Sequence, residues 1–573
     1  MSRIKPERAH TAEHFKSFGG LGNSLLAKER KATDMQNFRI DSDGSLKKRT
    51  GYRLAYDLPD TVYAYWEGTI DFTFYQFAVC RSKIYRIDPN SGSTTHVGTL
   101  KDTSNKHPEF VFFNDTLYLP DKGGLQMFHV ASNRFEDAQP YIPLYGNDWD
   151  PEKGGSVYES FNLLTNTIRV RYLNTNNSST FQLPFFASKI HGVIVNGTYT
   201  TNYSFTDQSD HFTLDAGLTG YIVEVGFEVM LSDEAEGIKS CKRGSVYPGQ
   251  HHSTMCLYQA DAGYRIYCSN YVSSKELANC RKIYTGSQNL YFTDRNVLFL
   301  GDPQSPVTSI RRYGNRLLAH SNTSTWEIFC PDDAADYVHA SALLPDTGCT
   351  APYSSILCNG QPLIVNQRGI FLLKIYASDN IPPDEIRISS DIESLLPKNF
   401  YERCIAREDP HHNELWIRDP DDSYGRVFVY HYVRKEWYIF TNFYTSLFLD
   451  FPHFKGFAYY GKLYAYDQTV YTDDDQAIEA FYQSGYFDFS HPESKKRSLR
   501  AISCVNIDED SASIKLETES NERTFRLPYR KSNAPEFFDI RTIMGRFRFL
   551  RFRILLSGKK DCRIYSLSFY ANL

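Results

Sequence analysis

Residues 413–440 read NELWIRDPDDSYGRVFVYHYVRKEWYIF, and their pattern is the clearest indication of the fold class in this sequence. Three short runs rich in apolar, aromatic and β-branched residues are separated by polar segments that contain Asp, Pro, Ser, Gly and Lys. Such runs favour strands, because flat and branched side chains pack well on a pleated, half-buried surface. The polar segments are typical of turns. The stretch therefore predicts antiparallel strands joined by tight turns.

A loose repeat of this unit extends over most of the chain. The other copies are FAVCRSKIYRID at 77–88, FVFFNDTLYLPDKGGLQMFHV at 110–130, IRRYGNRLLAHSNTSTWEIF at 310–329, ILCNGQPLIVNQRGIFLLKI at 356–375 and FAYYGKLYAYDQTVY at 457–471. Spacings of roughly 30 to 55 residues are typical of propellers in which each four-stranded blade is one sequence unit. We therefore predict an all-β fold, a β-propeller built from discontinuous segments, with stacked β-sandwiches as the alternative.

The repeat is interrupted once and then ends, which divides the chain into five predicted parts. These are an N-terminal arm and hairpin at 1–52, the first propeller blades at 53–144, an inserted β-domain at 145–287, the remaining blades at 288–490 and a C-terminal β-sandwich-like domain at 491–573. Helices are expected only in short segments, at 12–18, 24–34, 273–280 and 392–396.

Composition and charge narrow the class of protein. Aromatic residues make up 15% of the chain, with 41 Tyr and 40 Phe, which agrees with a β-rich protein. The net charge of −5 argues against a dedicated nucleic-acid binder, because such proteins carry a basic surface. Residues 491–573 differ, with 17 Lys or Arg against 10 Asp or Glu, which leaves about −12 for the rest of the chain.

The 11 cysteines are scattered and none forms a CxxC pair. This arrangement predicts buried free thiols in a protein made in a reducing cytoplasm. The N-terminal residues lack the apolar core of a signal peptide, and no run of 18 apolar residues occurs, so no membrane span is expected.

Motifs that carry enzyme chemistry are absent from the sequence. There is no GxSxG elbow, Walker-type glycine loop, HExxH or zinc-type Cys/His spacing. His411 and His412 are adjacent in a polar turn, and DSDGS at 41–45 begins like a calcium loop but is followed by basic residues. Three groups of acids, which a glycosidase could use, are interpreted as turn residues; they are Asp332, Asp333 and Asp336; Asp419, Asp421 and Asp422; and Asp473, Asp474 and Asp475. We predict that the protein is not an enzyme and has no catalytic, cofactor-binding or metal-binding residues.

Four arginines near the C-terminus form the one candidate contact for phosphates or for an acidic partner. They are Arg546, Arg548, Arg551 and Arg553. The solvated face of an amphipathic strand is the alternative reading. Because Phe547 and Phe552 lie on opposite parities of this segment, a β-bulge near Leu550 is expected to restore a single buried face.

The N-terminal region carries a more specific pattern. FGGLGNS at 18–24 and ATDMQNFRIDSDGSLKKRTGYR at 32–53 combine a Gly-rich segment, an acid-x-x-Asn-aromatic strand, a Gly turn and a basic Arg-x-Gly ending. Alternation of apolar and polar residues around a central Asp-Gly predicts a β-hairpin here. The pattern resembles the opening of podovirus tail hub and nozzle proteins, which include the packaged-DNA stabilisation proteins of P22-like phages and the tubular nozzle proteins of T7-like phages. The positions that carry the resemblance are Asp34, Asn37, Phe38, Gly44, Arg49 and Gly51.

Further segments resemble these proteins in the same order. YIPLYGN at 141–147 with ESFNLLT at 159–165 is similar to the segment that leads into their inserted β-domain. GCTAPYSSI at 348–356, PLIVNQRGIFLL at 362–373 and IRISSDIESLL at 386–396 are similar to their later blades, and GRFRFLRFRIL at 545–555 to their closing strands. The sequences of the insert and of the blades are this chain's own.

The resemblance implies a structural virion protein of a bacteriophage tail, made in the host cytoplasm. It implies a homohexameric ring below the portal–adaptor, which retains packaged DNA and provides the channel for DNA ejection. Expected partners are further copies of the chain, the portal-adaptor (head-to-tail connector) protein, tail fibre, tailspike or needle proteins, and genomic DNA that passes without sequence-specific binding. A receptor- or glycan-binding propeller at the tail tip is the alternative, and a secreted glycan-degrading propeller enzyme is a more remote one.

Overall fold

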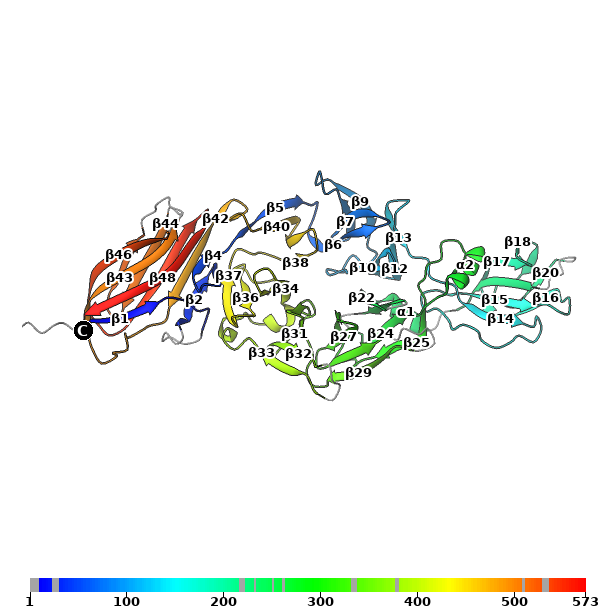
Figure 1. The fold of residues 1–573 in the computed structure, drawn as a ribbon. Coiled ribbons are helices and arrows are strands. Elements are labelled where there is room, and N and C mark those ends of the chain that lie inside the picture. The colour runs from blue at the N-terminus through cyan, green and yellow to red at the C-terminus, as the bar shows by residue number, and fades with distance from the viewer. Residues whose placement is uncertain are drawn as a thin grey trace, which may run out of the picture. The chain divides into compact units, whose positions relative to one another are not determined.

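The computed structural model describes residues 10–22, 30–215, 222–230, 233–249, 252–259, 263–330, 337–376, 381–507, 511–527 and 535–572 (Figure 1). Nearly all regular structure in these residues is β, which confirms the predicted all-β class and the β-propeller fold. The α-helices are short: α1 (Asp233–Lys239), α2 (Ser274–Ile283) and α3 (Phe400–Arg403). The chain divides into two compact units, unit 1 (Met1–Val62 and Thr350–Leu573) and unit 2 (Tyr63–Cys349).

Unit 2 contains four antiparallel four-stranded sheets of the blade type, each made from consecutive strands. The first two are β6 (Val62–Ile70), β7 (Thr73–Cys80), β8 (Lys83–Ile87) and β9 (Thr94–Thr99), then β10 (Val111–Phe113), β11 (Thr116–Asp121), β12 (Gly124–His129) and β13 (Arg134–Asp137). The other two are β22 (Arg243–Pro248), β23 (Ser253–Tyr258), β24 (Arg265–Ser269) and β25 (Phe292–Phe299), then β26 (Val307–Tyr313), β27 (Arg316–Ser321), β28 (Thr325–Phe329) and β29 (His339–Leu344).

An inserted β-domain separates the second and third of these sheets. Its strands are β14 (Leu144–Trp149), β15 (Thr167–Leu173), β16 (Thr180–Ala187), β17 (Lys189–Val195), β18 (Thr198–Thr200), β19 (Tyr203–Phe205), β20 (Ser209–Leu214) and β21 (Ile222–Glu228). A five-stranded sheet, β14-β15-β21-β17-β18, faces a three-stranded sheet, β16-β20-β19, across a core that includes Val170, Phe181 and Phe212. The sheets of the insert end at Glu228, earlier than the predicted 287, because β22 to β24 already belong to a blade-type sheet.

Unit 1 contains the remaining blade-type sheets. They are β30 (Leu357–Cys358), β31 (Gln361–Asn366), β32 (Gly369–Lys374) and β33 (Asp384–Arg387), then β34 (Ile405–Asp409), β35 (Glu414–Arg418), β36 (Val427–His431) and β37 (Glu436–Phe440). The stretch at 413–440 thus forms three antiparallel strands, as predicted. A further sheet, β38 (Leu447–Asp450), β39 (Lys455–Tyr459) and β40 (Lys462–Asp467), is completed by the N-terminal strand β5 (Gly51–Asp57).

The rest of unit 1 is a β-sandwich that combines both ends of the chain (Figure 1). One sheet has the order β3-β4-β48-β43-β46, with β1 also paired to β48, and the other continues from β5 through β41-β42-β47-β44-β45, with β2 paired to β42. The strands are β1 (His10–Phe15), β2 (Ala32–Gln36), β3 (Phe38–Ile40), β4 (Leu46–Lys48), β41 (Thr472–Asp473), β42 (Gln476–Ser484), β43 (Lys496–Ile507), β44 (Ser511–Thr518), β45 (Glu522–Arg526), β46 (Glu536–Phe547), β47 (Leu550–Gly558) and β48 (Cys562–Asn572). The predicted parts 1–52 and 491–573 therefore share one structure.

One predicted helix was wrong, one was wrong at its C-terminal end, and one was confirmed. The segment at 12–18 falls largely in strand β1, since its residues pair with β48, and residues 32–34 of the segment at 24–34 lie in strand β2. Residues 23–29 lie outside the described residues. The helix expected at 273–280 is α2, whose first turn is capped by the Ser273 side chain, and 392–396 contains a single 3-10 turn at Glu393–Leu395.

The bulge expected near Leu550 is not present. Strand β46 ends at Phe547, and β47 begins at Leu550 in the other sheet of the sandwich. Because the chain crosses between facing sheets here, Phe547 and Phe552 both point into the same core despite their opposite parity.

Candidate functional site

The family-like residues of the N-terminal region form the predicted hairpin and lie in the interior of unit 1. Phe38 pairs with Lys48 across β3 and β4 and is fully buried. The turn between these strands is made by the Asp43 carboxylate, which accepts the backbone N–H of Ser45 at 2.9 Å, and by Gly44 with a φ of +82°. A side chain is disfavoured at Gly44 for that backbone conformation.

Asn37 and Arg49 are the centre of a buried polar cluster, which we call the N-terminal junction. The Asn37 side chain accepts the Nε–H of Arg49 at 2.8 Å and the backbone N–H of Thr441 at 2.9 Å. Its amide donates to the carbonyl of Glu479 at 2.7 Å and to the Thr441 hydroxyl at 2.7 Å. One side chain thereby connects the hairpin to the end of β37 and to β42.

Arg49 carries a positive charge in the interior of unit 1, with 0% of its surface exposed. Its guanidinium donates to both carboxylate oxygens of Asp473, at 2.7 and 2.5 Å, and to the carbonyl of Thr441 at 2.9 Å. The ring of Phe443 lies 4.5 Å from the guanidinium carbon. The bidentate geometry satisfies charges that would otherwise be costly to bury.

Gly51 is required by close packing rather than by its backbone conformation. A Cβ atom at this position would lie 1.7 Å from the carbonyl oxygen of Thr472. Gly51 is also the first residue of β5, so its packing sets the start of the strand that completes the β38–β40 sheet.

Asp34 lies apart from the other family-like residues, in β2 opposite Gln483. Burial raises the pKa of the Asp34 carboxyl, and the Met35 backbone N–H and the Arg553 charge only partly oppose this effect. Of the motif residues, Asn37 and Arg49 therefore belong to the N-terminal junction, whereas Asp34 does not.

A second buried ion pair stabilises the same hairpin. It was not predicted from the sequence. Arg39 donates to both oxygens of Glu414, at 2.7 and 3.1 Å, and Trp416 donates its indole N–H to the same carboxylate at 2.9 Å. No short-range pattern relates Arg39 to Glu414, because the two residues are 375 positions apart.

The same carboxylate belongs to the one cluster of metal-ligand type found among the described residues. Ligand atoms of Asp409, His412 and Glu414 lie within 4.8 Å of one another. Burial would raise the pKa of Asp409, but the hydrogen bond from His412 and the Arg407 charge lower it below its usual range. Glu414 is already bound by Arg39. This arrangement is a set of ion pairs, and its arginines oppose the binding of a metal cation.

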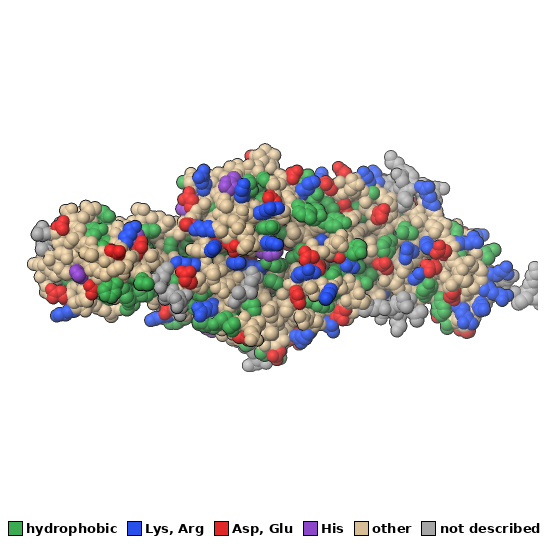
Figure 2. Space-filling view, turned by 180° about the vertical axis from the view of Figure 1, so that it is seen from behind, with side chains coloured by type: hydrophobic (Ala, Val, Ile, Leu, Met, Phe, Trp, Pro, Cys, Tyr) green, Lys and Arg blue, Asp and Glu red, His purple; other side chains and the backbone are tan. Residues whose placement is uncertain are grey.

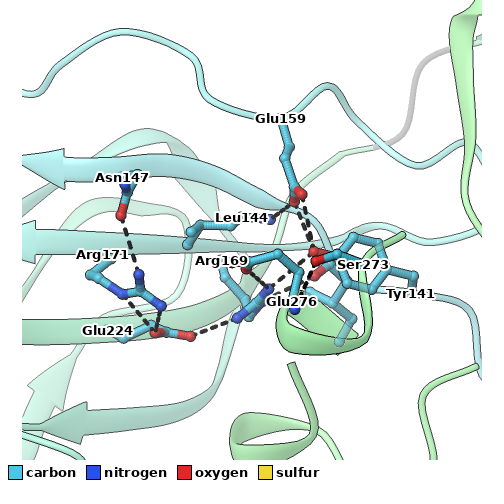
Figure 3. Close-up of polar contacts among 10 residues, drawn as sticks. Tyr141, Leu144, Asn147, Glu159, Arg169, Arg171, Glu224, Ser273 and Glu276 are labelled. Carbon is cyan, nitrogen blue, oxygen red and sulfur yellow. Dashed lines mark hydrogen bonds and ion pairs between the residues drawn. The ribbon is translucent and has the colours of Figure 1, made fainter. Parts of the chain in front are cut away.

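A second polar cluster, the insert junction, lies where the chain enters the inserted β-domain (Figure 3). The Glu159 carboxylate accepts the Tyr141 hydroxyl at 2.9 Å and the backbone N–H of Leu144 at 2.5 Å. Burial raises the pKa of Glu159, with opposing hydrogen bonds from Leu144 and Tyr141. These residues belong to the two segments, 141–147 and 159–165, that resemble the entrance to the insert of tail hub proteins.

Arg169 on β15 holds the insert junction together (Figure 3). It is fully buried and donates to Glu224 of β21 at 2.8 Å, to the carbonyl of Ile142 at 3.0 Å and to the Tyr141 hydroxyl at 3.3 Å. Arg171 binds the other oxygen of Glu224 at 3.0 Å. Burial disfavours the charge of Arg169, but the Glu224 carboxylate, together with Cys280 and Tyr141, outweighs this effect and raises the pKa of Arg169.

An apolar cavity of about 550 Å³ opens beside the insert junction. Its wall includes Tyr145, Phe161 and Phe185, whose ring centroids are 5.1 to 5.3 Å apart. Phe186 and Met230 also line it and are 65% and 88% exposed. Figure 2 shows hydrophobic side chains (green) at the surface of this part of unit 2. Sequence reasoning missed the cavity, because its residues come from separate segments.

The four arginines predicted to contact phosphates or a partner do not form one row. Arg551 pairs with Glu517 at 2.6 Å, and Arg553 donates its Nε–H to Gln483 at 2.9 Å. Arg546 and Arg548 lie at the end of β46 and in the turn after it, and both are exposed. The pair Arg546 and Arg548 is thus the part of the set that faces solvent.

The predicted turn acids at 419–422 form ion pairs with nearby arginines, whereas Asp473 is buried in β41 and binds the distant Arg49, so the turn interpretation was wrong for Asp473. Asp419 and Asp421 bind Arg403 at 2.8 and 2.6 Å, and Asp422 binds Arg426 at 3.0 Å. The group Asp332, Asp333 and Asp336 lies outside the described residues. All 11 cysteines are buried, as predicted.

The sequence matches no model of a known protein family and no curated protein. Among solved structures, the AfRom2 CNH domain is 7% identical with a TM-score of 0.36, over 74% of this chain and 99% of that one. The extracellular domain of BT4673 from B. thetaiotaomicron is 9% identical with a TM-score of 0.26, over 88% and 62%. An exo-β-1,3-galactanase from Phanerochaete chrysosporium is 8% identical with a TM-score of 0.22, over 91% and 100%. At such identities these likenesses concern the fold alone.

No helix in the described ranges has both the length and the apolar character needed to cross a bilayer.

Proposed function

We propose that this protein is a structural component of a bacteriophage tail, a subunit of the ring-shaped hub or nozzle that retains packaged DNA and forms its exit channel. The sequence resemblance to podovirus tail hub proteins is the origin of this proposal. The observation that carries it further is the N-terminal junction, where Asn37 and Arg49 of the motif meet Asp473. In this proposal, these motif residues hold distant strands of the subunit together.

The arrangement of the junctions supports a mechanical role. The segment that resembles the start of tail hub proteins forms a buried ion pair with a distant part of the chain. The segments that resemble their insert entrance hydrogen-bond to Arg169, which pairs with Glu224. Such networks join discontinuous segments firmly when every charge has a partner. A channel protein under the pressure of packaged DNA needs strong contacts of this kind between its segments. An enzyme instead needs acids or nucleophiles that are free to react in a cleft.

Charge distribution supports assembly from identical copies. Residues 491–573 carry 17 basic and 10 acidic residues, whereas the remainder of the chain is acidic. In a ring, unlike surfaces of neighbouring copies meet, and opposite charges favour that contact. The acidic remainder also suits a channel wall, because it repels DNA phosphates and does not retain them.

The test is the oligomeric state of the purified protein, alone and with a portal–adaptor complex, by mass photometry and negative-stain imaging. A homohexameric ring that forms on the adaptor supports the proposal. A monomer that ignores the adaptor contradicts it. Replacing Arg546 and Arg548 by alanine tests whether the exposed arginines contact a partner, with the exposed Lys495 and Lys559 replaced by alanine as the matched control.

The receptor- or glycan-binding propeller is the second candidate, and the apolar cavity beside the insert junction favours it. Aromatic walls with an exposed Phe186 are a surface on which sugar rings or apolar side chains can pack. A glycan-array and cell-binding assay on wild type and Phe186→Ala distinguishes the two candidates. The receptor-binding role would be favoured if the wild type binds glycans or cells, Phe186→Ala abolishes this binding, and the protein stays monomeric in the presence of the adaptor.

A further inference from the structure

Three thiols that neither junction uses lie together in unit 2. Cys256 on β23 and Cys268 on β24 are directly opposite each other in the antiparallel register, and their Sγ atoms are 2.6 Å apart. Cys330 comes directly after β28. All three belong to one hydrophobic cluster, and Cys256 and Cys268 have no exposed surface.

The strand register is suitable for a covalent bond between the first two thiols. Residues directly opposite on antiparallel strands have Cα atoms roughly 4.5 to 5.5 Å apart. This range lies inside the separation of about 4.4 to 6.8 Å that disulfides span. Bond formation therefore needs only side-chain rotation, with no movement of the two strands.

We propose that Cys256 and Cys268 are a site of oxidative modification, at which a hydroperoxide converts the two thiols to a cross-strand disulfide. One thiol sulfur attacks the peroxide and breaks its O–O bond, which yields a sulfenic acid and one water when hydrogen peroxide is the oxidant. The second thiol sulfur then attacks the sulfenic sulfur. The hydroxyl group of the sulfenic acid leaves and takes up the proton of the second thiol, which forms a second water. The two sulfurs are then joined by an S–S bond.

The surroundings of the pair make this reaction slow and dependent on pH. The hydrogen bond with Cys268, followed by burial, raises the pKa of Cys256, and burial raises the pKa of Cys268. Because the thiolate is the reactive form, few molecules react at neutral pH and the rate increases as the pH rises. The oxidant also needs a local opening of the sheet to reach the sulfurs. The disulfide therefore forms gradually on exposure to oxidant.

Peptide mapping of the full chain tests the proposal without any variant. Trypsin cleaves after Arg265, which places Cys256 on peptide 244–265 and Cys268 on peptide 266–275. The reduced protein is treated with hydrogen peroxide, free thiols are blocked with N-ethylmaleimide, and the digest is analysed without reductant. We expect the two peptides to be joined, with a mass two hydrogens below the sum of the free peptides.

Oxidation of Met230 to the sulfoxide reports that the oxidant has acted, because this side chain is 88% exposed. Cys256→Ser and Cys268→Ser should each abolish the joined product, whereas Cys241→Ser, another buried thiol, should leave it unchanged. Recovery of both peptides with blocked thiols after Met230 is oxidised would overturn the proposal. A bond from Cys256 to Cys330 in place of Cys268 would overturn it as well.

Discussion

At the scale of single residues, the contribution of the family-like motif to stability depends on one buried charge, that of Arg49. Arg49 is fully buried, and its guanidinium forms a bidentate ion pair with Asp473. Arg49→Met keeps much of the side-chain volume but leaves Asp473 as an unpaired buried anion. Loss of one partner of such a pair costs about 3–5 kcal/mol. We expect this decrease in the free energy of unfolding of unit 1, measured by urea denaturation followed by tryptophan fluorescence.

Arg53→Met is the matched control for Arg49→Met. Arg53 also binds an aspartate, Asp467, but its side chain is 61% exposed. Exposed ion pairs contribute about 0–1 kcal/mol, because water and salt screen them. If the two variants lose similar stability, the N-terminal junction does not hold unit 1 together.

A buried histidine makes unit 2 sensitive to acid. Burial, followed by the Arg311 charge, lowers the pKa of His320 to about 4. The unfolded chain, with a histidine pKa near 6.5, binds this proton first, so stability is complete above pH 6.5 and is lost as the pH falls towards 4. The loss amounts to at most about 3.5 kcal/mol, at about 1.4 kcal/mol per pH unit.

Unfolding of the wild type and of His320→Asn at about pH 7 and about pH 4.5 checks this prediction. The variant loses packing and a hydrogen bond with Thr325 at both pH values, but it has no histidine to protonate. We therefore expect a smaller decrease on acidification in the variant. Equal decreases in both proteins would show that other groups cause the acid sensitivity.

The residues of the motif could be identified from the sequence, but their partners could not. The Asp-Gly turn and the buried Phe38 follow from local pattern alone. Arg49 and Asp473 are 424 positions apart, and Arg169 and Glu224 are 55 apart. Nothing in the local sequence distinguishes these charges from the exposed ones, since burial is set by tertiary packing.

At the scale of elements, strands with clear alternation were predicted well, and errors arose where distant segments pair. Strands β35, β36 and β37 coincide with the apolar runs of 413–440. The segment at 12–18 has helical spacing, yet β1 forms there because the edge of β48 is available to it. The parity change at Leu550 was read as a bulge within one strand, because a single sequence does not show that two sheets face each other.

Gly51 allows a test of how close packing sets strand pairing, because it lies where β5 pairs with β41. Gly51→Ala would place a Cβ atom 1.7 Å from the Thr472 carbonyl oxygen, so backbone must move and the pairing of β5 is disturbed. We expect a loss of at least about 3 kcal/mol by urea denaturation, at the upper end for overpacking. Gly360→Ala has open space around its Cβ and should cost about 1–2 kcal/mol from its φ of +72° alone. A smaller cost for Gly51→Ala would contradict this role of Gly51.

At the scale of the whole molecule, the division into two units could not be predicted from the order of the repeats. The repeats predicted a propeller built from discontinuous segments, with residues 1–52 as a separate N-terminal arm and hairpin. In the structure, the N-terminal strands β1 to β5 join the C-terminal half of the chain, and unit 2 occupies the intervening residues. This arrangement makes unit 2 an insertion, through residues 62 and 350, into a unit that holds both termini.

Each unit has hydrophobic clusters of its own, and this leads to a prediction about unfolding. The cluster around Phe38 and Trp437 belongs to unit 1, and those around Phe77, Ile310 and Val170 belong to unit 2. Separate cores favour separate cooperative transitions in differential scanning calorimetry. Arg49→Met should lower the midpoint of one transition only, and acidification towards pH 4 should lower the other more strongly in wild type than in His320→Asn. A single transition that both changes shift equally would show that the units unfold as one cooperative body. Mechanical coupling between them would then have to be included in any account of the proposed ring.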